Sequence, residues 1–211
     1  MTSVIVDITM SLDGFVTAPD AGPEHGLGVD GEALHEWVFN HAPLNQKVLD
    51  EAFTRTGAII MGRNTFDVID GPHGWSDDLG YGAERDQTVA PPPIFVVTHS
   101  APDAWRLGDR ITFVTDGLPS AVEKARAAAG EKDVVIMGGG QTCHAFLAAG
   151  LVDLLNIHLS PLILGAGTRL FPVEESRRMA LELLATVSAP GAEHLSYRVL
   201  DGRPSAAAIQ Q

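Results

Sequence analysis

Cysteine, positive charge and long apolar runs are all scarce in this sequence, and each scarcity excludes a class of protein. The single cysteine, Cys143, leaves no intramolecular disulfide and fits a reducing cytoplasm. No apolar run approaches the roughly 20 residues that a membrane-crossing helix needs. The opening MTSVIVDITM lacks the basic start and apolar stretch of a secretory signal, so none is expected. The formal net charge of −13 argues against nucleic acid or an anionic membrane as a partner.

Metal-binding and hydrolytic motifs are also missing. The eight histidines do not occur in an H-x-x-x-H or H-E-x-x-H spacing, and Cys143 has no second cysteine to pair with at a metal. No serine lies in a G-x-S-x-G elbow. We therefore expect neither a bound metal nor nucleophilic hydrolysis.

Short β-rich runs alternate with helical patterns, which predicts an α/β fold with a mostly parallel central sheet flanked by helices. An antiparallel hairpin is expected at the C-terminus, around Pro190 and Gly191. We predict one domain over residues 1–201 and a frayed tail over 202–211. Strands are predicted at 3–10, 57–61, 93–98, 111–115, 133–137 and 154–160, helices at 44–55, 119–129 and 141–149, and loops at 19–31 and 70–93.

Three consecutive glycines, Gly138 to Gly140, separate the apolar run DVVIM from the helical pattern that follows. A strand, a glycine turn and a helix start are the order that a phosphate site needs, because backbone N–H groups converge there. The motif is not the dinucleotide fingerprint G-x-G-x-x-G, since Cys143 holds its last position, and it is not a P-loop. A phosphate cradle and a structural turn both remain open.

Similar signals follow other predicted strands. In IIMGRNTFDVI, Gly62 permits close approach, Arg63 supplies a cation and Thr65 is a helix cap or phosphate donor. FVVTHS ends in Thr98, His99 and Ser100, and SPLILGAGTRLF bends at Gly165. Several of these signals fall at the carboxyl ends of predicted parallel strands, the edge where open α/β sheets bind nucleotides.

Taken together, these blocks resemble the dihydrofolate reductase superfamily, and most closely the riboflavin-biosynthesis reductase group, the RibD C-terminal domain. DITMSLDGFV is similar to that group's first strand followed by Ser-Leu-Asp-Gly. IIMGRNTFDVI resembles the Met-Gly-Arg-x-Thr-Phe/Tyr block of dihydrofolate reductases. The glycine block and the strand DLLNIHLSP match the remaining pattern, so the resemblance covers about residues 3–200.

The resemblance implies a three-layer, dihydrofolate reductase-like fold and an NADPH-dependent reductase that acts on a small planar heterocycle. It also suggests a homodimer that pairs through the sheet edge and the C-terminal hairpin. The alternatives are 5-amino-6-(5-phosphoribosylamino)uracil reductase of riboflavin biosynthesis and a non-catalytic nucleotide-binding protein. The cofactor-binding residues that it implies are Gly62, Arg63, Asn64, Thr65, Thr98, His99, Ser100, Gly138, Gly139, Gly140, Gln141, Thr142, Leu164 and Gly165.

The reacting end of the site has fewer candidates. Asp13 follows the first strand, and we expect it either to act as a catalytic and substrate-binding group or to close an Asx-type turn. Trp37 is expected either to stack on a planar substrate or to serve in the core or a dimer contact. Dihydrofolate reductases carry a carboxylate on their first helix, and Asp30, Glu32 and Glu36 compete for that place.

Overall fold

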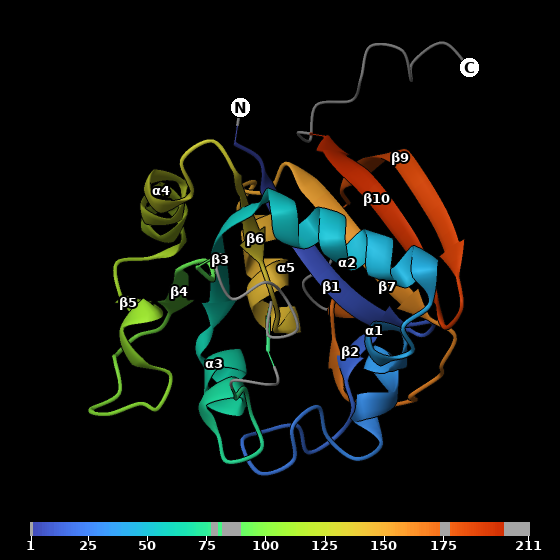
Figure 1. Cartoon of the computed structure of the whole chain (residues 1–211), viewed down its shortest axis with the longest axis horizontal. Helices are drawn as coiled ribbons and strands as arrows, with labels where there is room; N and C mark the ends of the chain where they lie inside the picture. The colour runs from blue at the N-terminus through green and yellow to red at the C-terminus, as the bar shows by residue number, and fades with distance from the viewer. Residues whose placement is uncertain (1, 77–79, 82–89, 174–177, 201–211) are drawn as a thin grey trace.

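The computed structural model describes residues 2–76, 80–81, 90–173 and 178–200, and an eight-stranded sheet runs through its centre (Figure 1). The strand order is β5-β4-β3-β6-β1-β7-β10-β9. The first six strands of this order, from β5 to β7, pair in parallel. The last two, β10 and β9, pair antiparallel and complete the sheet. The strands of this sheet are β1 (Val4–Ser11), β3 (Thr56–Gly62), β4 (Ile94–Val97), β5 (Ile111–Val114), β6 (Asp133–Ile136), β7 (Leu154–Ser160), β9 (Ala180–Ala189) and β10 (Ala192–Leu200).

Helices cover both faces of the sheet, which gives the three-layer α/β fold that the sequence predicts. Figure 1 shows α1, α2 and α3 on the face toward the viewer, with α5 behind the sheet. A second, two-stranded sheet joins β2 (Phe15–Thr17) to β8 (Thr168–Arg169). The helices are η1 (Gly31–His35), α1 (Glu36–Phe39), α2 (Pro43–Arg55), α3 (Arg63–Asp70), η2 (Gly108–Arg110), α4 (Leu118–Ala129) and α5 (Gly140–Ala148).

The strand sequences are almost continuously apolar because both faces of the parallel sheet are buried. Along β3, Ala58 and Ile60 pack in the larger core cluster with α4 and α5, whereas Ile59 and Met61 pack with α3. All four side chains are fully buried. Because successive side chains of a strand point to opposite faces of the sheet, two cores form, one under each helix layer.

Local signals set the element ends close to where the sequence predicts them. Pro119 lies in the first turn of α4, and Gly130 follows its last residue with φ +62°, a conformation that favours glycine. In the C-terminal hairpin, Gly191 has φ +83° between β9 and β10. The hairpin predicted from Pro190 and Gly191 is confirmed.

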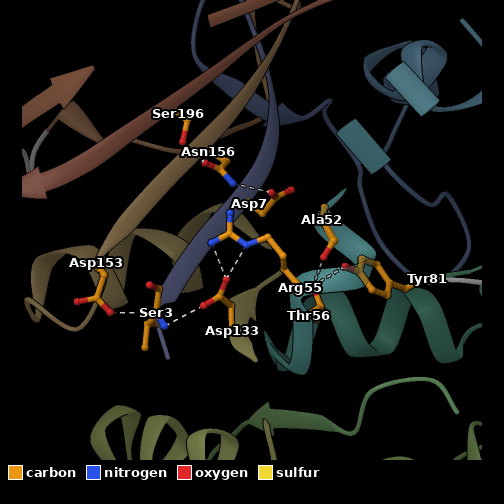
Figure 2. Close-up of polar contacts among 11 residues, drawn as sticks. Ser3, Asp7, Ala52, Arg55, Thr56, Tyr81, Asp133, Asp153, Asn156 and Ser196 are labelled. Carbon is orange, nitrogen blue, oxygen red and sulfur yellow. Dashed lines mark hydrogen bonds and ion pairs between the residues drawn. The ribbon is translucent and has the colours of Figure 1, made fainter. Parts of the chain in front are cut away.

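The edge of the sheet that holds the amino ends of the strands is tied by polar contacts (Figure 2). The guanidinium of Arg55, at the end of α2, donates to one carboxylate oxygen of Asp133 over 3.0 and 2.8 Å. The backbone N–H of Ser3 donates to the other oxygen of Asp133 over 3.0 Å. These contacts join α2 and the chain start to β6, far from the glycine turns at the opposite edge.

Two predicted segments fall partly or wholly outside the described residues. The tail at 202–211 lies outside them, as does much of the predicted loop at 70–93. Trp75, in the described part of that loop, packs against the smaller core cluster, and the guanidinium carbon of Arg110 lies 6.0 Å from its ring centre. Among the described residues, every helix is too short or too polar to span a bilayer.

Candidate functional site

The carboxyl ends of the six parallel strands lie along one edge of the sheet, and the predicted cofactor residues follow four of them, β3, β4, β6 and β7. Strand β3 ends at Gly62 and pairs with β6 through Ile60 and Ile136. On its other side β3 pairs with β4, where Gly62 lies opposite Val97. Because parallel strands end at the same edge, the 62–65, 98–100 and 138–142 segments are neighbours.

The two glycine turns touch each other. A Cβ atom added at Gly62 would lie 2.0 Å from the hydroxyl oxygen of Thr142, and one added at Gly139 would lie 3.1 Å from that of Thr65. Each turn therefore receives the threonine of the other helix: a side chain would clash with Thr142 at Gly62, and it would be tightly packed against Thr65 at Gly139. The structure brings together two segments that are more than 70 residues apart in the sequence.

Each of these turns opens a helix. Helix α3 begins at Arg63 and α5 begins at Gly140, with Gly62 and Gly139 as their N-caps, and neither cap residue supplies a side-chain hydrogen bond. The first N–H groups of a helix have no partner within it, and the helix dipole adds partial positive charge there. Two such ends on adjoining strands suit a ligand with more than one phosphate.

Arg63 is held in place by contacts on both sides. Its Nε donates to the carboxylate of Asp67 over 2.7 Å, and its Nη1 donates to the carbonyl of Ser100 over 3.0 Å. The Thr98 hydroxyl also donates to the Ser100 carbonyl, over 2.9 Å. Arg63 thus links the α3 turn to the 98–100 segment, and its side chain is 36% exposed, open to an anion at the rim.

The remaining polar residues predicted for the cofactor lie on the outer surface of this rim. Asn64, His99, Ser100 and Gln141 are exposed, and Thr98 is partly buried. Their side chains are therefore accessible to a ligand that crosses the two helix starts.

The glycine turns continue into the part of the rim that holds Asp13. A Cβ atom at Gly140 would lie 2.9 Å from the carbonyl oxygen of Arg169, in β8. The guanidinium of Arg169 in turn donates to the carbonyl of Asp13 over 3.0 Å, and its central carbon lies 4.3 Å from the ring centre of Phe15. Close packing at Gly140 thus joins α5 to the turn after β1.

Asp13 is a clamp between two loops. One carboxylate oxygen accepts from the Ser11 hydroxyl over 2.6 Å and from the Leu164 N–H over 3.1 Å. The other accepts from the Gly165 N–H over 2.7 Å. The hydrogen bond from Ser11, with those from Gly165 and Leu164, lowers the pKa of Asp13 to about 2, against the opposing effect of burial. Asp13 is therefore an anion at neutral pH, and it holds Leu164 and Gly165 at the end of β7.

Trp37 lies inside the protein. Its side chain is 3% exposed, and its indole N–H donates to the Thr9 hydroxyl over 3.1 Å. The rings of His158 and His194 lie 4.5 and 4.9 Å from it, centre to centre. Of the two roles expected for Trp37, this placement matches packing in the core.

The three competing carboxylates differ in their surroundings. Glu32 accepts a hydrogen bond from the Leu27 N–H over 3.2 Å, which closes the 19–31 loop. Asp30 is the N-cap of η1 with φ 58°, and Glu36 opens α1 at the surface.

Two residues of the site were missed in the sequence. Ser11 both donates to Asp13 and accepts from the Phe15 N–H over 2.9 Å, and Arg169 braces the same turn. The Ser-Leu-Asp-Gly spacing contains the signal for Ser11, since a hydroxyl two residues before an aspartate can close a turn with it. The role of Arg169 depends on the pairing of β2 with β8, which no local pattern indicates.

Comparisons with known proteins identify the family and the fold. The family model "RibD C-terminal domain" matches residues 2–191. The chain is 23% identical over 183 residues to the uncharacterized protein YyaP of Bacillus subtilis (strain 168), covering 87% of each chain. It resembles the crystal structure of a putative riboflavin biosynthesis protein from Shewanella sp. PV-4 (TM-score 0.65, 22% identity, 95% of this chain and 100% of that one). It also resembles dihydrofolate reductase from Enterococcus faecalis complexed with NADP(H) (TM-score 0.54, 17% identity, 94% of this chain and 97% of that one).

Proposed function

The chain belongs to the RibD C-terminal domain family, and from this premise we propose that it is an NADPH-dependent reductase that transfers hydride to a small planar heterocycle. The observation that carries the proposal is the contact between the two glycine turns, Gly62 against Thr142 and Gly139 against Thr65. It aligns the starts of α3 and α5 along one rim, where a dinucleotide pyrophosphate would accept hydrogen bonds from both.

The preference for NADPH over NADH rests on the outer part of the rim. Arg63, fixed by Asp67 and the Ser100 carbonyl, places a cation beside Thr98 and Ser100, where a 2′-phosphate would need donors. The Enterococcus faecalis dihydrofolate reductase that shares the fold was solved with NADP(H). In a chain with a formal net charge of −13, this arginine would supply positive charge that such a phosphate needs.

In the proposed complex, the cofactor supplies the hydride and the protein supplies position. The Gly138–Thr142 and Gly62–Thr65 segments would hold the pyrophosphate, and Leu164 and Gly165 would approach the nicotinamide. Asp13 would fix those two residues through their N–H groups. Since Asp13 is already ionised, the proton that completes reduction would come from another group or from water.

A second candidate, 5-amino-6-(5-phosphoribosylamino)uracil reductase, is favoured by the likeness to a riboflavin biosynthesis protein. One assay separates the possibilities. NADPH and NADH are titrated by quenching of tryptophan fluorescence, and NADPH oxidation is then followed with dihydropterins and with ribosylaminopyrimidines as acceptors.

We expect NADPH to bind at least about tenfold more tightly than NADH, and Arg63→Ala to abolish that difference. Oxidation with one acceptor class identifies the substrate. Tight NADPH binding with no turnover of either class would support a non-catalytic nucleotide-binding protein, and no binding of either nucleotide would overturn the proposal.

We also propose a homodimer that pairs through the C-terminal hairpin. Strand β9 is the edge of the sheet, and it exposes Leu181, Leu183 and Leu184 by 39%, 56% and 42%. A long apolar edge strand is a liability unless another chain covers it. A second copy of the same hairpin would bury these leucines.

A further inference from the structure

A line of polar side chains, partly exposed at Asp7 and buried beyond it, crosses the molecule from β1 to α2, away from the glycine turns. Asp7 Oδ1 lies 3.0 Å from His158 Nε2, and His158 Nδ1 lies 2.8 Å from His194 Nδ1. His194 Nε2 lies 2.9 Å from Asn45 Oδ1. His158 and His194 are each 6% exposed and Asn45 is fully buried, whereas the Asp7 side chain is 23% exposed, so the contacts from His158 to Asn45 are shielded from water.

The orientation of the Asn45 amide is fixed by backbone groups. Its Nδ2 donates to the carbonyl of Pro190 over 2.9 Å and to Asn40 Oδ1 over 2.9 Å. Asn40 Oδ1 is itself identified as the oxygen because it accepts from the Ala42 N–H over 3.0 Å. Rotating the Asn45 amide would place its oxygen against two acceptors. Asn45 therefore presents Oδ1 to His194, and His194 must carry its proton on Nε2.

Counting protons along the line gives the charge of the histidine pair. The Asp7 contact, the contact between the rings and the Asn45 contact each need one proton. The pKa of Asp7 is lowered, so its carboxyl is ionised and all three protons lie on the rings. Two neutral imidazoles carry two protons in total, so three protons give the pair one positive charge. The carboxylate of Asp7 balances this charge, and its other oxygen accepts from Asn156 Nδ2 over 3.1 Å (Figure 2).

The charge belongs on His158, the ring beside the carboxylate. The ring of Trp37 lies 4.5 Å from that of His158, close enough for a cation–π contribution. Burial first, and the charge of His158 second, lower the pKa of His194 to about 4. Burial acts to raise the pKa of Asp7, but the charge and hydrogen bond of His158, together with the hydrogen bond from Asn156, lower that pKa.

We propose that Asp7, His158, His194 and Asn45 form a latch that holds one buried positive charge on His158 and fastens the C-terminal hairpin to α2, and that a second proton, on His194, opens it. Protonated His194 would turn an N–H toward the N–H of His158, with the ring centres 4.9 Å apart. The hydrogen bond between the rings would be lost and two like charges would face each other in a buried site.

The other charged groups around the latch come from three elements. The charge of His158 contributes to lowering the pKa of His35 in η1, and the charge of Glu193 on β10 acts to raise the pKa of His194. On α2, Lys47 pairs with Glu51 at the surface over 3.8 Å. No hydrogen bond or ion pair joins a lysine or arginine to either imidazole within the described ranges.

The sign of the pH dependence follows from His194. Its pKa is about 6.5 in an unfolded chain and about 4 in the folded one, so the unfolded chain takes up the proton first as pH falls. The stability that unprotonated His194 contributes is complete above pH 6.5 and is lost as pH falls toward 4. His35 acts in the same direction, since burial first and His158 second lower its pKa to about 4.

The charge state is tested by nitrogen-15 NMR of the histidine rings in the full chain at neutral pH. We expect both ring nitrogens of His158 to carry protons and His194 to carry one, on Nε2. Two neutral rings, or a proton on Nδ1 of His194 with Nε2 bare, would overturn the proposal. This measurement needs no variant.

The opening step is tested by hydrogen exchange and urea unfolding between pH 7 and 4.5. The folded-to-unfolded ratio should fall roughly tenfold to a hundredfold through His194, and β10 amides should lose protection before those of β6. His194→Gln should show a shallower pH dependence, and His25→Gln, at an exposed histidine, should match the parent protein. Equal loss of protection in β10 and β6, or an unchanged slope in His194→Gln, would rule out the latch.

Discussion

Asp13 shows how most of the hydrogen-bonding capacity of one side chain can be taken up by the protein itself. Its two oxygens accept three hydrogen bonds, from Ser11, Leu164 and Gly165. Two of these donors belong to the segment after β7, which lies more than 150 residues away in the sequence. The sequence places Asp13 at the sheet edge, but only the fold shows that the carboxylate is an anchor for another loop.

The ionisation of Asp13 should therefore be invisible in the pH profile of the proposed reductase activity. Its pKa of about 2 keeps it charged above pH 4. We expect Asp13→Asn to lower kcat/KM about tenfold, because an amide cannot accept from all three donors, while the shape of the profile is unchanged. Initial rates across the pH range test this. The disappearance of an ionisation from the profile of Asp13→Asn would instead identify Asp13 as the proton donor.

Replacement of Gly62 should test whether the glycine turn before α3 binds the cofactor. A methyl group at this position would meet the Thr142 hydroxyl at 2.0 Å and push the starts of α3 and α5 apart. We expect Gly62→Ala to weaken NADPH binding by about tenfold or more, measured by fluorescence titration. Gly22→Ala is the matched control, because a Cβ there would have no neighbour within 4 Å. Equal affinities for the two variants would contradict a cofactor at this turn.

At the scale of elements, α5 contributes both to the glycine turn and to the larger core. Its start lies at the glycine turn, and its inner face carries Cys143, Phe146 and Leu147 into the larger core. Burial raises the pKa of the Cys143 thiol to about 12, so the thiol stays protonated and acts as a small apolar group. The packing of this face fixes where the N–H groups at the start of the helix point.

Removing core contacts of α5 should therefore lower both the stability of the protein and its affinity for NADPH. Phe146 is fully buried, and Phe146→Ala is expected to lower the free energy of unfolding by about 3–5 kcal/mol. Urea denaturation measures this loss, and NADPH affinity should fall in parallel. Phe39, 55% exposed, provides the control, since Phe39→Ala should leave the midpoint nearly unchanged. A Phe146→Ala protein of parental stability would show that α5 is not anchored through this ring.

At the scale of the whole molecule, the sheet has two unlike edges. Strand β5 closes one end with four residues, and the ten-residue β9 closes the other with three exposed leucines. The short edge offers little to a partner, whereas the long one presents both backbone groups and apolar surface.

The proposed homodimer predicts a different response at each edge. Leu183→Lys should convert the protein to a monomer in light scattering coupled to size-exclusion chromatography, because two buried lysines would face each other across the contact. Thr112→Lys, at an exposed position on β5, should leave the dimer intact. A parent protein that is monomeric at micromolar concentration would rule out this interface.

The sequence by itself determined the alternation of strands and helices. Val-, Ile- and Leu-rich runs, Pro119 and Gly130 around α4, and Gly191 in the hairpin act over a few residues, so their effects can be recognised locally. It also placed Gly62 and Gly139 each between a strand and a helix. The short η1 and α1 helices and the β2–β8 pair were missed, because too few residues form them to show a period.

The tertiary structure alone decided which strands are neighbours, and with them the contents of the site. Placing β3 beside β6 brings Gly62 to Thr142, and placing β1 beside β7 brings Asp13 to Leu164 and Asp7 to His158. These contacts join residues 80 to more than 150 positions apart, and no local pattern contains them. Local sequence determines what each segment can form, whereas the pairing of strands, set by burying both faces of one sheet, determines which side chains meet.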